Sequence, residues 1–443
     1  MGLMAALARR GLKVAPFKVG PDFIDPGHHS RVTGAVSRNL DGWMLSKAYN
    51  LACFKDAVCP ADVAVIEGVM GLFDGYDGKT ESGSTAQMAK WLDVPVVLTV
   101  DARSMARSAA AVVMGFENFD RDLNFAGVVF NNLGSTRHLG YLAEALEGTV
   151  RVPLLGGIIR DGEISIPQRH LGLFTSEDHP LSDEMIKRLA AAVENGMNLD
   201  QLLESLPEVV PANPESITAV QQKRAAVRIG VARDNAFCFY YRDNLDLLEA
   251  SGAQLVFFSP IDDARLPADI DGLYFGGGYP ELAAERLAAN ADLRNQIRKK
   301  SREGMPIYAE CGGFMYLCRE LSDQNQKGFA MAGCFPFAAR MNSRLKALGY
   351  REVTLTRDTI IGPAGQTMRG HEFHYSVLEK NSTKIDTVYR LTDRVGIDKP
   401  PEGYYANRTL GSYTHLHFGS QPRIATHLVA ACASYKGERK KRL

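Results

Sequence analysis

One cysteine lies at an abrupt boundary between two kinds of predicted secondary structure. The apolar, strand-like run that begins at Pro306 ends at Cys311, and Gly312 and Gly313 then precede a helix-like run. A strand-to-helix turn of this kind holds a nucleophile above a parallel sheet, with glycines where a side chain would clash. The backbone N–H after the nucleophile points to the place where an oxyanion forms. The pattern therefore predicts that the Cys311 thiol takes part in acyl transfer.

Three other segments carry residue types that suit the same chemistry. Glycines 276–278 follow a strand-like run and open a helix, which lets backbone N–H groups surround a small anionic centre, although a tight turn accounts for them as well. His415 and His417 stand at strand spacing, which predicts that both face the same way, and either is suited to deprotonate Cys311. For each histidine a structural role is an equally good interpretation. The polar and aromatic residues 370–375 either line the same site or pair within a sheet.

A second group of chemically active residues follows two strand-like runs near the beginning of the chain. Lys18 and Asp22 come after one run, and Glu67 and Asp74 come after another. The carboxyl ends of neighbouring parallel strands meet at the ligand crevice of an open α/β sheet. Carboxylate oxygens suit Mg²⁺ and a lysine suits phosphate, so the pattern predicts a site for magnesium plus phosphate. A single acid at a strand end is usually a helix cap, but two such strand ends favour a functional site.

The elements that position these residues alternate between strand and helix. Strands are predicted at residues 14–19, 63–66, 95–100 and 126–131, with a weaker candidate at 154–159, and helices at 84–92, 104–116 and 137–146. The pattern weakens over residues 195–225 and resumes with strands at 227–231, 254–258, 272–275 and 306–309 and a helix at 281–302. Continuous Val-rich strands between helices indicate parallel sheets that are covered on both faces. Residues 353–418 are richer in antiparallel strand.

Length and composition indicate two ordinary globular domains. At 443 residues the chain is too long for one core, so we expect one domain over residues 1–194, a linker over 195–225 and a second domain over 226–435. The basic residues 436–443 are expected to form a solvated, frayed tail. The 51 basic and 51 acidic residues balance, which argues against nucleic acid or a membrane surface as a partner.

Cysteine spacing and the first residues bear on the cellular compartment. The seven cysteines form no Cys-x-x-Cys pair, so neither a zinc site nor a disulfide scaffold is predicted. The apolar stretch over residues 1–8 precedes positive charge, which reverses the order of a secretory signal, and no stretch is long enough to span a bilayer. We therefore expect a cytoplasmic protein. Its oligomeric state is left open, a homodimer included.

The second half of the chain resembles a known domain family. Residues 276–281, 308–313 and 413–418 resemble the class I glutamine amidotransferase domain, in the branch that amidates corrinoids. The resemblance implies that a cysteine thiolate, here Cys311, attacks the carboxamide of L-glutamine and releases ammonia. A glutamyl thioester remains on the enzyme and is hydrolysed by water.

The same resemblance assigns the partners of Cys311. It implies that Gly277 and Gly312 donate hydrogen bonds to the oxyanion, and that His415, which fills the Tyr-x-His position of the branch, is the base. His417 is a competitor for that role. Many class I members have a glutamate two residues after the histidine, and here His417 occupies that position. A Cys–His dyad with an open third position is therefore expected.

Nearly the whole chain, to about residue 430, resembles the cobyrinic acid a,c-diamide synthase family. The likeness is carried by residues 13–26, 37–41, 63–75, 231–237 and 258–260. It implies an α/β fold with two open, mostly parallel sheets, in which a P-loop-NTPase-like (dethiobiotin-synthetase-like) domain precedes the class I glutamine amidotransferase domain. It also implies ATP and Mg²⁺ as cofactors and cobyrinic acid as the substrate, in cobalamin biosynthesis. ATP phosphorylates the a and c acetate carboxylates, and ammonia then displaces phosphate from each acyl phosphate.

This family resemblance also assigns residues of the first domain. Three acids are implied as ligands of Mg²⁺ or as groups that position the carboxylate: Asp22, Glu67 and Asp74. Asp22, Phe23 and Ile24 are implied to contact the macrocycle. Lys18 and Asn131 are implied to bind the nucleotide, the lysine at its phosphates and the asparagine at its base.

One motif of the family does not occur in the printed sequence. Relatives have a strand and a phosphate-binding Gly-x-x-x-x-Gly-Lys-[Ser/Thr] loop directly before the helix that here spans residues 2–10. We therefore expect a chain truncated before or through this loop, and a first domain that lacks its first strand and Walker A loop. The parallel sheet would then be short of a central strand, and ATP affinity and turnover would collapse. A start codon assigned too far downstream is the simplest reason for the missing loop.

Three alternatives remain open from the residues alone. The same chemistry can act on hydrogenobyrinic acid or nickel sirohydrochlorin, because nothing in these residues decides the metal. The chain can instead be an ATP-dead pseudo-synthetase or binding protein that keeps its glutaminase domain. A plain glutaminase is the third alternative, but it gives no role to the acidic strand ends of the first domain.

Overall fold

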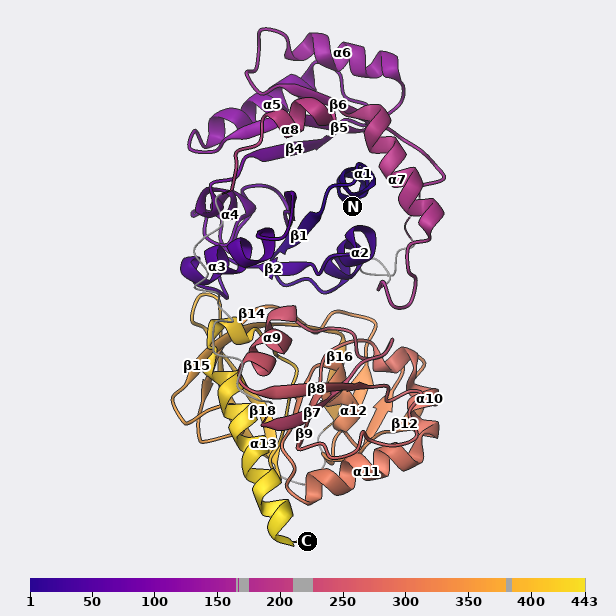
Figure 1. Ribbon diagram of the computed structural model, residues 1–443, viewed down its shortest axis with the longest axis vertical. Coiled ribbons are helices and arrows are strands. Elements are labelled where there is room, and N and C mark those ends of the chain that lie inside the picture. Colours follow the sequence, from indigo (N-terminus) through magenta and orange to yellow (C-terminus); the bar gives the residue numbers. More distant parts are fainter. Residues whose placement is uncertain (165, 167–174, 210–225, 380–384, 443) are drawn as a thin grey trace. The chain divides into compact units, whose positions relative to one another are not determined.

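The structure, a computed structural model, divides the chain into two compact units (Figure 1). It describes residues 1–164, 166, 175–209, 226–379 and 385–442. The first unit is Met1–Trp43 with Lys47–Glu215, and the second is Met44–Ser46 with Ser216–Leu443. Over the described residues, no helix is both long enough and apolar enough to cross a membrane.

The first unit alternates strands with helices, as the sequence predicts. Its elements in chain order are α1 (Gly2–Arg9), β1 (Val14–Val19), α2 (Ile24–Thr33), β2 (Arg38–Leu40), α3 (Lys47–Val58), β3 (Val63–Glu67), α4 (Thr85–Leu92), β4 (Val96–Asp101), α5 (Ser108–Phe119), β5 (Phe125–Leu133), α6 (Thr136–Leu146), β6 (Leu154–Ile159), α7 (Asp183–Gly196) and α8 (Leu199–Glu204). The predicted strands are confirmed as β1, β3, β4, β5 and β6, and the predicted helices as α4, α5 and α6. The helix predicted from residue 104 begins only at Ser108, because Ser104 has a φ of 59°, which is not helical.

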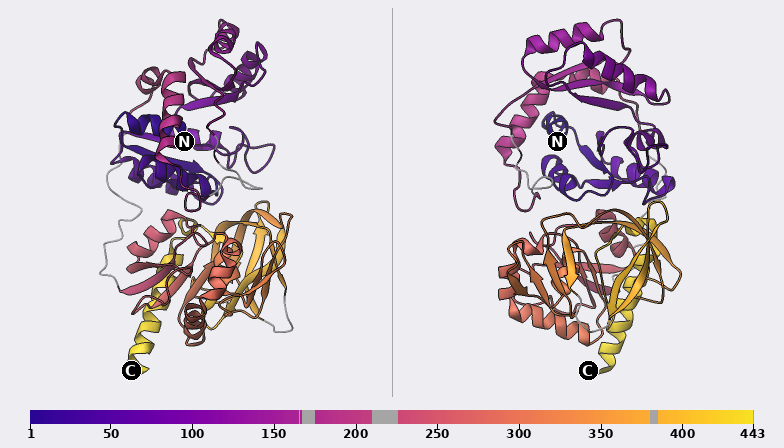
Figure 2. Two further views of the ribbon diagram at one scale, coloured as in Figure 1. Left: turned by 90° about the vertical axis from the view of Figure 1, so that its right-hand side faces the viewer. Right: turned by 180° about the vertical axis from the view of Figure 1, so that it is seen from behind.

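Short polar side chains begin several of the helices. Ser84, Ser135 and Ser182 each accept a hydrogen bond from the backbone N–H three residues later, which satisfies a donor that has no partner inside the helix. Helices α1 and α7 lie side by side (Figure 2), and Met4 and Val193 from these two helices belong to one hydrophobic core. Helices α4, α6 and α7 therefore begin at side-chain caps, and α1 and α7 bury apolar side chains in a shared core.

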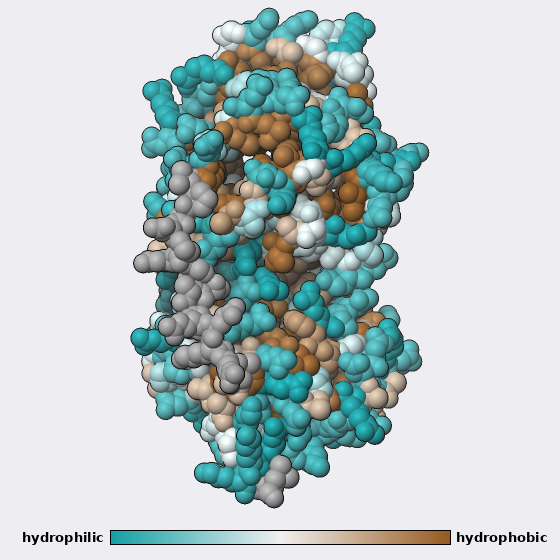
Figure 3. Space-filling model, viewed as in Figure 1, coloured by the Kyte–Doolittle hydropathy of each residue, from teal (hydrophilic) through white to brown (hydrophobic). Residues whose placement is uncertain are grey.

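The parallel sheet of the first unit is interrupted. Its strands form two separate sheets, with the orders β2-β1-β3 and β4-β5-β6, and every strand pair is parallel. All residues of β1 are buried, whereas all residues of β3 are only partly buried. In the part of the chain that the structure describes, β3 and β4 share no ladder, and a cavity of about 980 Å³ is lined by both strands and by α1 and α4. Figure 3 shows hydrophobic side chains within the hollow of this unit.

The second unit contains more strands than the first. Its elements are β7 (Val227–Ala232), α9 (Arg242–Ala250), β8 (Ala253–Phe258), β9 (Gly272–Phe275), η1 (Pro280–Leu282), α10 (Ala284–Ala289), α11 (Ala291–Arg302), β10 (Ile307–Glu310), α12 (Gly312–Leu317), β11 (Glu320–Ser322), β12 (Gly328–Ala330), β13 (Ala338–Met341), β14 (Ala347–Leu355), β15 (Thr367–His374), β16 (Ser376–Glu379), β17 (Asp386–Asp393), β18 (Asp398–Ala406), β19 (Thr409–Ser412), β20 (His415–Leu416), η2 (Phe418–Ser420) and α13 (Arg423–Arg442).

One mixed sheet of ten strands organises this unit, in the order β20-β15-β14-β17-β18-β19-β10-β9-β7-β8. The pairs from β8 to β19 are parallel, and the pairs from β19 to β20 are antiparallel. The antiparallel region predicted over residues 353–418 is therefore confirmed. A separate sheet of four short strands has the order β12-β11-β13-β16.

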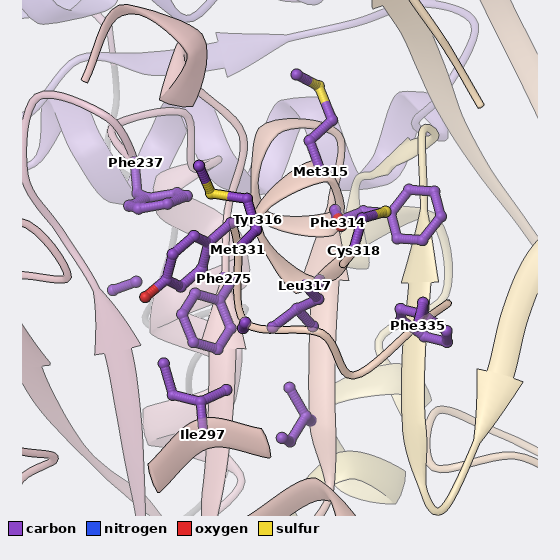
Figure 4. Packing of buried hydrophobic residues seen from close by; sticks show 14 of the residues in the cluster. Phe237, Phe275, Ile297, Phe314, Met315, Tyr316, Leu317, Cys318, Met331 and Phe335 are labelled. Carbon is purple, nitrogen blue, oxygen red and sulfur yellow. Dashed lines mark hydrogen bonds between the residues drawn. The ribbon is translucent and has the colours of Figure 1, made fainter. Parts of the chain in front are cut away.

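Helices cover both faces of the parallel part of the ten-stranded sheet. On one face, Tyr316 of α12 packs against Phe275 of β9, with the ring centroids 5.8 Å apart (Figure 4). On the other face, Leu248 of α9 and residues of α13 form a second core. Side chains alternate between the faces of a strand, so Ile307 belongs to the first core and Tyr308 to the second. This alternation sets the direction of the residues at the end of β10.

Two predicted segments differ in detail. The helix predicted over residues 281–302 is divided into η1, α10 and α11. The break between α10 and α11 falls at Asn290, which has a ψ of 63° and whose side chain donates to two backbone carbonyls. The linker predicted over residues 195–225 begins inside α7 and contains α8. Residues 210–225 of that linker lie outside the described residues.

The solvated tail predicted from residue 436 is wrong for the described residues. Residues 436–442 continue α13 instead. Lys436 and Arg439 lie 3.5 and 3.1 Å from the carboxylate of Asp271, which is fully buried. A buried carboxylate requires an opposite charge nearby, so these two basic side chains are held against the unit by Asp271 and do not extend freely into solvent.

Candidate active sites of the two units

Cys311 occupies the turn between β10 and α12, where its backbone has φ 43° and ψ −103°. A positive φ costs a residue with a side chain about 1–3 kcal/mol, so the surrounding chain must hold it. The Cys311 N–H donates to the carbonyl of Ser412 at 2.7 Å, and the Gly313 N–H donates to that of Gly276 at 2.9 Å. A Cβ on Gly313 would lie 2.5 Å from the carbonyl oxygen of Phe275. The predicted turn and its requirement for glycine are confirmed.

His415 is the histidine that the fold brings to Cys311. Its strand β20 pairs with β15 so that His415 is opposite His371, and the two rings stack with their centroids 4.9 Å apart. Burial lowers the pKa of His415. The Cys311 thiolate, a hydrogen bond between Cys311 and the ring, and the Glu310 carboxylate outweigh burial and raise this pKa to about 9. The imidazole therefore lies between a thiol and a carboxylate.

His417 has a different environment. Strand β20 ends at Leu416, so His417 does not continue the strand face of His415 as the spacing predicts, and it caps the short helix η2 instead. Its Nδ1 accepts a hydrogen bond from the Gly419 N–H at 3.1 Å, and its Nε2 lies 4.0 Å from Asp243. Burial lowers the pKa of His417 to about 4, despite the nearby Asp243 carboxylate. The geometry favours His415 over His417 as the partner of Cys311.

The glycine loop after β9 approaches the imidazole closely. A Cβ on Gly277 would lie less than 3.0 Å from Cε1 of His415 and 3.2 Å from both ring nitrogens. The Gly277 N–H, which is predicted to bind an oxyanion, donates to the carbonyl of Phe239 at 3.1 Å. The N–H groups of Gly278 and Gly312 donate no hydrogen bond within the described residues. A Cβ on Gly312 would lie 3.0 Å from the nitrogen of Gly278, so these two groups are neighbours.

Glu310, the last residue of β10, is a site residue that the sequence pattern does not predict. Its side chain is 1% exposed, and its Oε2 lies 3.6 Å from Nδ1 of His415. The Tyr308 hydroxyl and the Leu416 N–H donate to Oε1 at 2.7 and 3.2 Å, and the Tyr274 hydroxyl donates to Oε2 at 3.3 Å. The only signal in the sequence is a charged residue at the end of an apolar strand.

The polar and aromatic segment 370–375 both lines this site and pairs within the sheet. Most of it belongs to β15, next to β20. The carbonyl oxygen of Phe373 lies 3.9 Å from the sulfur of Cys311. The ring of His374 stacks on Tyr413 with the centroids 3.9 Å apart, and burial lowers the pKa of His374 to about 4. Both open interpretations of this segment therefore hold.

In the first unit, Lys18 is the centre of an acidic cluster. Its Nζ lies 2.6 Å from Asp25, 2.9 Å from Glu67 and 3.8 Å from Asp22. The register of β1 and β3 pairs Lys18 with Glu67, which is why the two strand ends meet. Nε2 of His29 lies 2.7 Å from the second oxygen of Glu67. Burial lowers the pKa of Lys18, but the carboxylates of Glu67 and Asp25 outweigh burial and raise it.

The three acids predicted to bind magnesium are not brought together. Asp74 binds within its own loop, where it accepts a hydrogen bond from the Gly71 N–H at 2.9 Å. Over the described residues, no group of three potential ligand side chains is placed to hold a metal ion. Mg²⁺ commonly uses only one or two carboxylates together with phosphate oxygens and water. Asp22 and Glu67, which flank Lys18, fit that requirement as a pair.

The remaining predicted residues of this unit lie at two different elements, helix α2 and strand β5. Phe23 precedes α2 and Ile24 begins it, directly after Asp22. Asn131 lies on β5, where it is paired with Asp101 of β4. The described contacts do not join Asn131 to the Lys18 cluster, because β3 and β4 are not paired.

These two units define a nucleotide-binding domain followed by a glutamine amidotransferase domain. Residues 1–173 match the family model of the CobQ/CobB/MinD/ParA nucleotide binding domain, and residues 228–423 match that of the CobB/CobQ-like glutamine amidotransferase domain. The chain belongs to the cobyrinate a,c-diamide synthase family. The α/β fold class expected from the sequence is confirmed.

Curated relatives of this family match nearly the whole chain. Cobyrinate a,c-diamide synthase of Syntrophotalea carbinolica is 47% identical over 435 residues, which cover 98% of this chain and 95% of that protein. The synthases of Leptospira interrogans serovar copenhageni and Methanosarcina acetivorans are 44% and 41% identical, and the matches cover 98% and 99% of this chain and 94% and 93% of those proteins. The nucleotide-binding model matches from residue 1, and the comparisons give no support to the expected truncation.

Proposed function

We propose that the protein is an ATP-dependent, glutamine-hydrolysing amidotransferase that converts the a and c acetate carboxylates of cobyrinate into amides. The observation that carries the proposal is the buried pair of Cys311 and His415 at the turn after β10. It occurs in a chain whose first unit matches a nucleotide-binding domain. The names of the relatives, which are 47% and 44% identical, supply the substrate and favour cobyrinate over hydrogenobyrinic acid or nickel sirohydrochlorin.

The chemistry of the second unit begins at the thiolate of Cys311. The thiolate attacks the carboxamide carbon of glutamine, so a C–S bond forms and the carbonyl electrons move to oxygen. We assign the stabilisation of this oxyanion to the N–H groups of Gly278 and Gly312. Protonated His415 gives its proton to the leaving nitrogen, the C–N bond breaks and ammonia departs. Water, deprotonated by His415, then attacks the thioester and releases glutamate and the thiol.

Gly277 has a different part in this proposal from the one predicted. Its N–H is engaged by Phe239, so we assign it no contact with the oxyanion. Its lack of a side chain instead leaves room for the ring of His415. His417 likewise has no part in the proton transfers, because it binds Gly419 and faces Asp243.

We assign the ATP-dependent step to the Lys18 cluster of the first unit. A carboxylate oxygen of the substrate attacks the γ-phosphorus, ADP leaves, and ammonia then displaces phosphate from the acyl phosphate. Lys18 offsets the phosphoryl charge, and Asp22 and Glu67 would hold Mg²⁺, which neutralises phosphate oxygens when bound. The family resemblance supports contacts of Phe23 and Ile24 with the macrocycle and of Asn131 with the base.

The test uses glutamine labelled with heavy nitrogen in its amide. Purified protein is incubated with the labelled glutamine, Mg²⁺ and cobyrinate, with and without ATP, and the corrinoid is examined by mass spectrometry. We expect a product with two labelled amides that forms only with ATP. Parallel reactions with hydrogenobyrinic acid and nickel sirohydrochlorin measure substrate preference. Glutamine hydrolysis with no label in any tetrapyrrole would refute the synthetase function and support a pseudo-synthetase.

A cytoplasmic location is part of the proposal, because the reaction consumes ATP and glutamine. The proposed partners are small molecules only, namely L-glutamine, ATP and the corrinoid. Light scattering during size-exclusion chromatography distinguishes a monomer from a homodimer.

A further inference from the structure

We infer that Glu310 orients His415 and stabilises its protonated form, which makes the amidotransferase centre a Cys–His–Glu triad. The inference rests on the proposed roles of Cys311 and His415. The acid of this triad comes from the end of β10, directly before the nucleophile. It does not come from the position two residues after the histidine, which is His417 here.

The position of the Glu310 carboxylate carries the inference. Its Oε2 lies 3.6 Å from Nδ1 of His415, and the two side chains are 1% and 2% exposed. Hydroxyl groups of Tyr308 and Tyr274 and the N–H of Leu416 donate to the carboxylate. These neutral donors fix the carboxylate in place but do not balance its charge, and a buried charge is costly unless an opposite charge is near. Protonated His415 supplies that charge.

Among the described side chains around His415, none other than Glu310 offers a carboxylate. His371 of β15 stacks on the ring, and burial lowers the pKa of His371 well below its usual range. Cys311 of the turn is the group that reacts. The loop after β9 approaches the ring through Gly277, which has no side chain. Glu310 is therefore the acid in the immediate surroundings of the imidazole.

The backbone geometry allows two adjacent residues to reach the same imidazole. Alternation along β10 directs Glu310 to the face of Tyr308, whose hydroxyl it binds. The next residue, Cys311, has a φ of 43°, so the chain leaves the strand direction there and presents the thiol from another side. Glu310 is nearest to Nδ1, which leaves Nε2 as the nitrogen that exchanges a proton with Cys311. An acid that fixes one ring nitrogen in this way sets the orientation and tautomer of the other.

The test compares Glu310→Gln, which removes the charge at nearly constant volume, with Glu402→Gln. Glu402 is a second buried glutamate of the same sheet, and it binds Ser412 and Tyr413. For Glu310→Gln we expect glutamine-dependent ammonia release to fall about 10²- to 10⁴-fold, as for other positioned acids. Amidation with added ammonia should stay within about twofold of the parent protein. Glu402→Gln should change neither rate.

A pH profile separates a positioning role from a structural one. The rate of Cys311 alkylation by iodoacetamide and the kcat/KM for glutamine are measured from pH 5 to 10 in each protein. Removal of the counter-charge destabilises imidazolium, so in Glu310→Gln the limb that belongs to His415 should move to lower pH by at least one unit. Glu310→Asp, which keeps the charge, should recover part of the rate and keep the test valid if the glutamine variant does not fold.

Two results would overturn the triad. One is glutamine-dependent activity of Glu310→Gln within threefold of the parent protein, and the other is a loss of activity with no movement of the pH limb. Failure of the underlying proposal is recognised separately. In that case the parent protein releases no ammonia from glutamine, or Cys311→Ala releases as much as the parent protein does.

Discussion

The close approach of Gly277 to His415 makes one substitution especially informative. In Gly277→Ala, the new methyl group would lie less than 3.0 Å from Cε1 and 3.2 Å from both nitrogens of the imidazole. Carbon atoms in ordinary contact are about 3.5–4.0 Å apart, so the ring must withdraw by about 1 Å or the loop must shift by a similar distance. Either movement changes the position of the base relative to Cys311.

The size of the effect follows from this displacement. A misplacement of about 1 Å in a catalytic group costs about 10²-fold in rate, which corresponds to about 2.7 kcal/mol of transition-state stabilisation. We therefore expect the kcat/KM of Gly277→Ala for glutamine to fall by about 10²-fold. The first unit contains no part of this contact, so amidation with added ammonia should be retained.

The assay measures ammonia release from glutamine and ammonia-dependent amidation on the same preparations, together with thermal unfolding. Gly437→Ala is the matched control, because a Cβ on Gly437 would meet nothing within 4 Å. The reasoning is refuted if Gly277→Ala keeps glutamine-dependent activity within threefold of the parent protein at an unchanged Tm. It also fails if both activities fall together, because the damage would then not be confined to the imidazole.

Three further predictions concern other groups of the two sites. Cys311→Ala should abolish glutamine-dependent amidation and retain ammonia-dependent amidation, and a failure of ammonia to rescue it would give Cys311 a role beyond ammonia release. Lys18→Met should abolish amidation with either nitrogen source and lower the free energy of unfolding by about 1–3 kcal/mol. This value is smaller than for a fully buried ion pair because Glu67 is 37% exposed. Lys187 is exposed, so the control Lys187→Met should change neither amidation nor stability. Burial raises the pKa of Glu402 from 4.5 to about 8, so the folded state holds a proton that the unfolded state has lost, and stability falls as pH rises between these values. Glu402→Gln should remove this dependence of stability on pH, so the Tm of the variant should exceed that of the parent protein at pH 8 and match it at pH 5. If variant and parent have equal Tm values at both pH 5 and pH 8, Glu402 is already ionised in the folded protein.

The strand-to-helix turn at Cys311 could be predicted because its cause is local. The carbonyl oxygen of Phe275 leaves no room for a Cβ at position 313, and the glycine there records that requirement directly in the sequence. Most of the parallel strands of both units were likewise predictable, because continuous apolar runs between helices are typical of such strands. The pairing of Lys18 with Glu67 follows from the same logic, since the carboxyl ends of adjacent parallel strands meet.

The choice between the two histidines could not be made from their spacing. A period of two places them on one face only if the strand continues, and β20 ends at Leu416. Glu310 was missed for a related reason, because the three groups that bind its carboxylate come from β9, β10 and β20. The hydrogen bond of the Asp74 carboxylate with the Gly71 N–H is a local contact that a strand pattern does not reveal.

The arrangement of the triad along the chain has a consequence for biosynthesis. Glu310 and Cys311 leave the ribosome together, but His415 follows Cys311 by 104 residues. At a synthesis rate of about 5–20 residues per second, His415 is added about 5–20 s after Glu310 and Cys311. Ammonia production by the nascent chain therefore cannot begin before β20 is made and pairs with β15. Strand β20 is the last strand in chain order, and it supplies the base that completes the site.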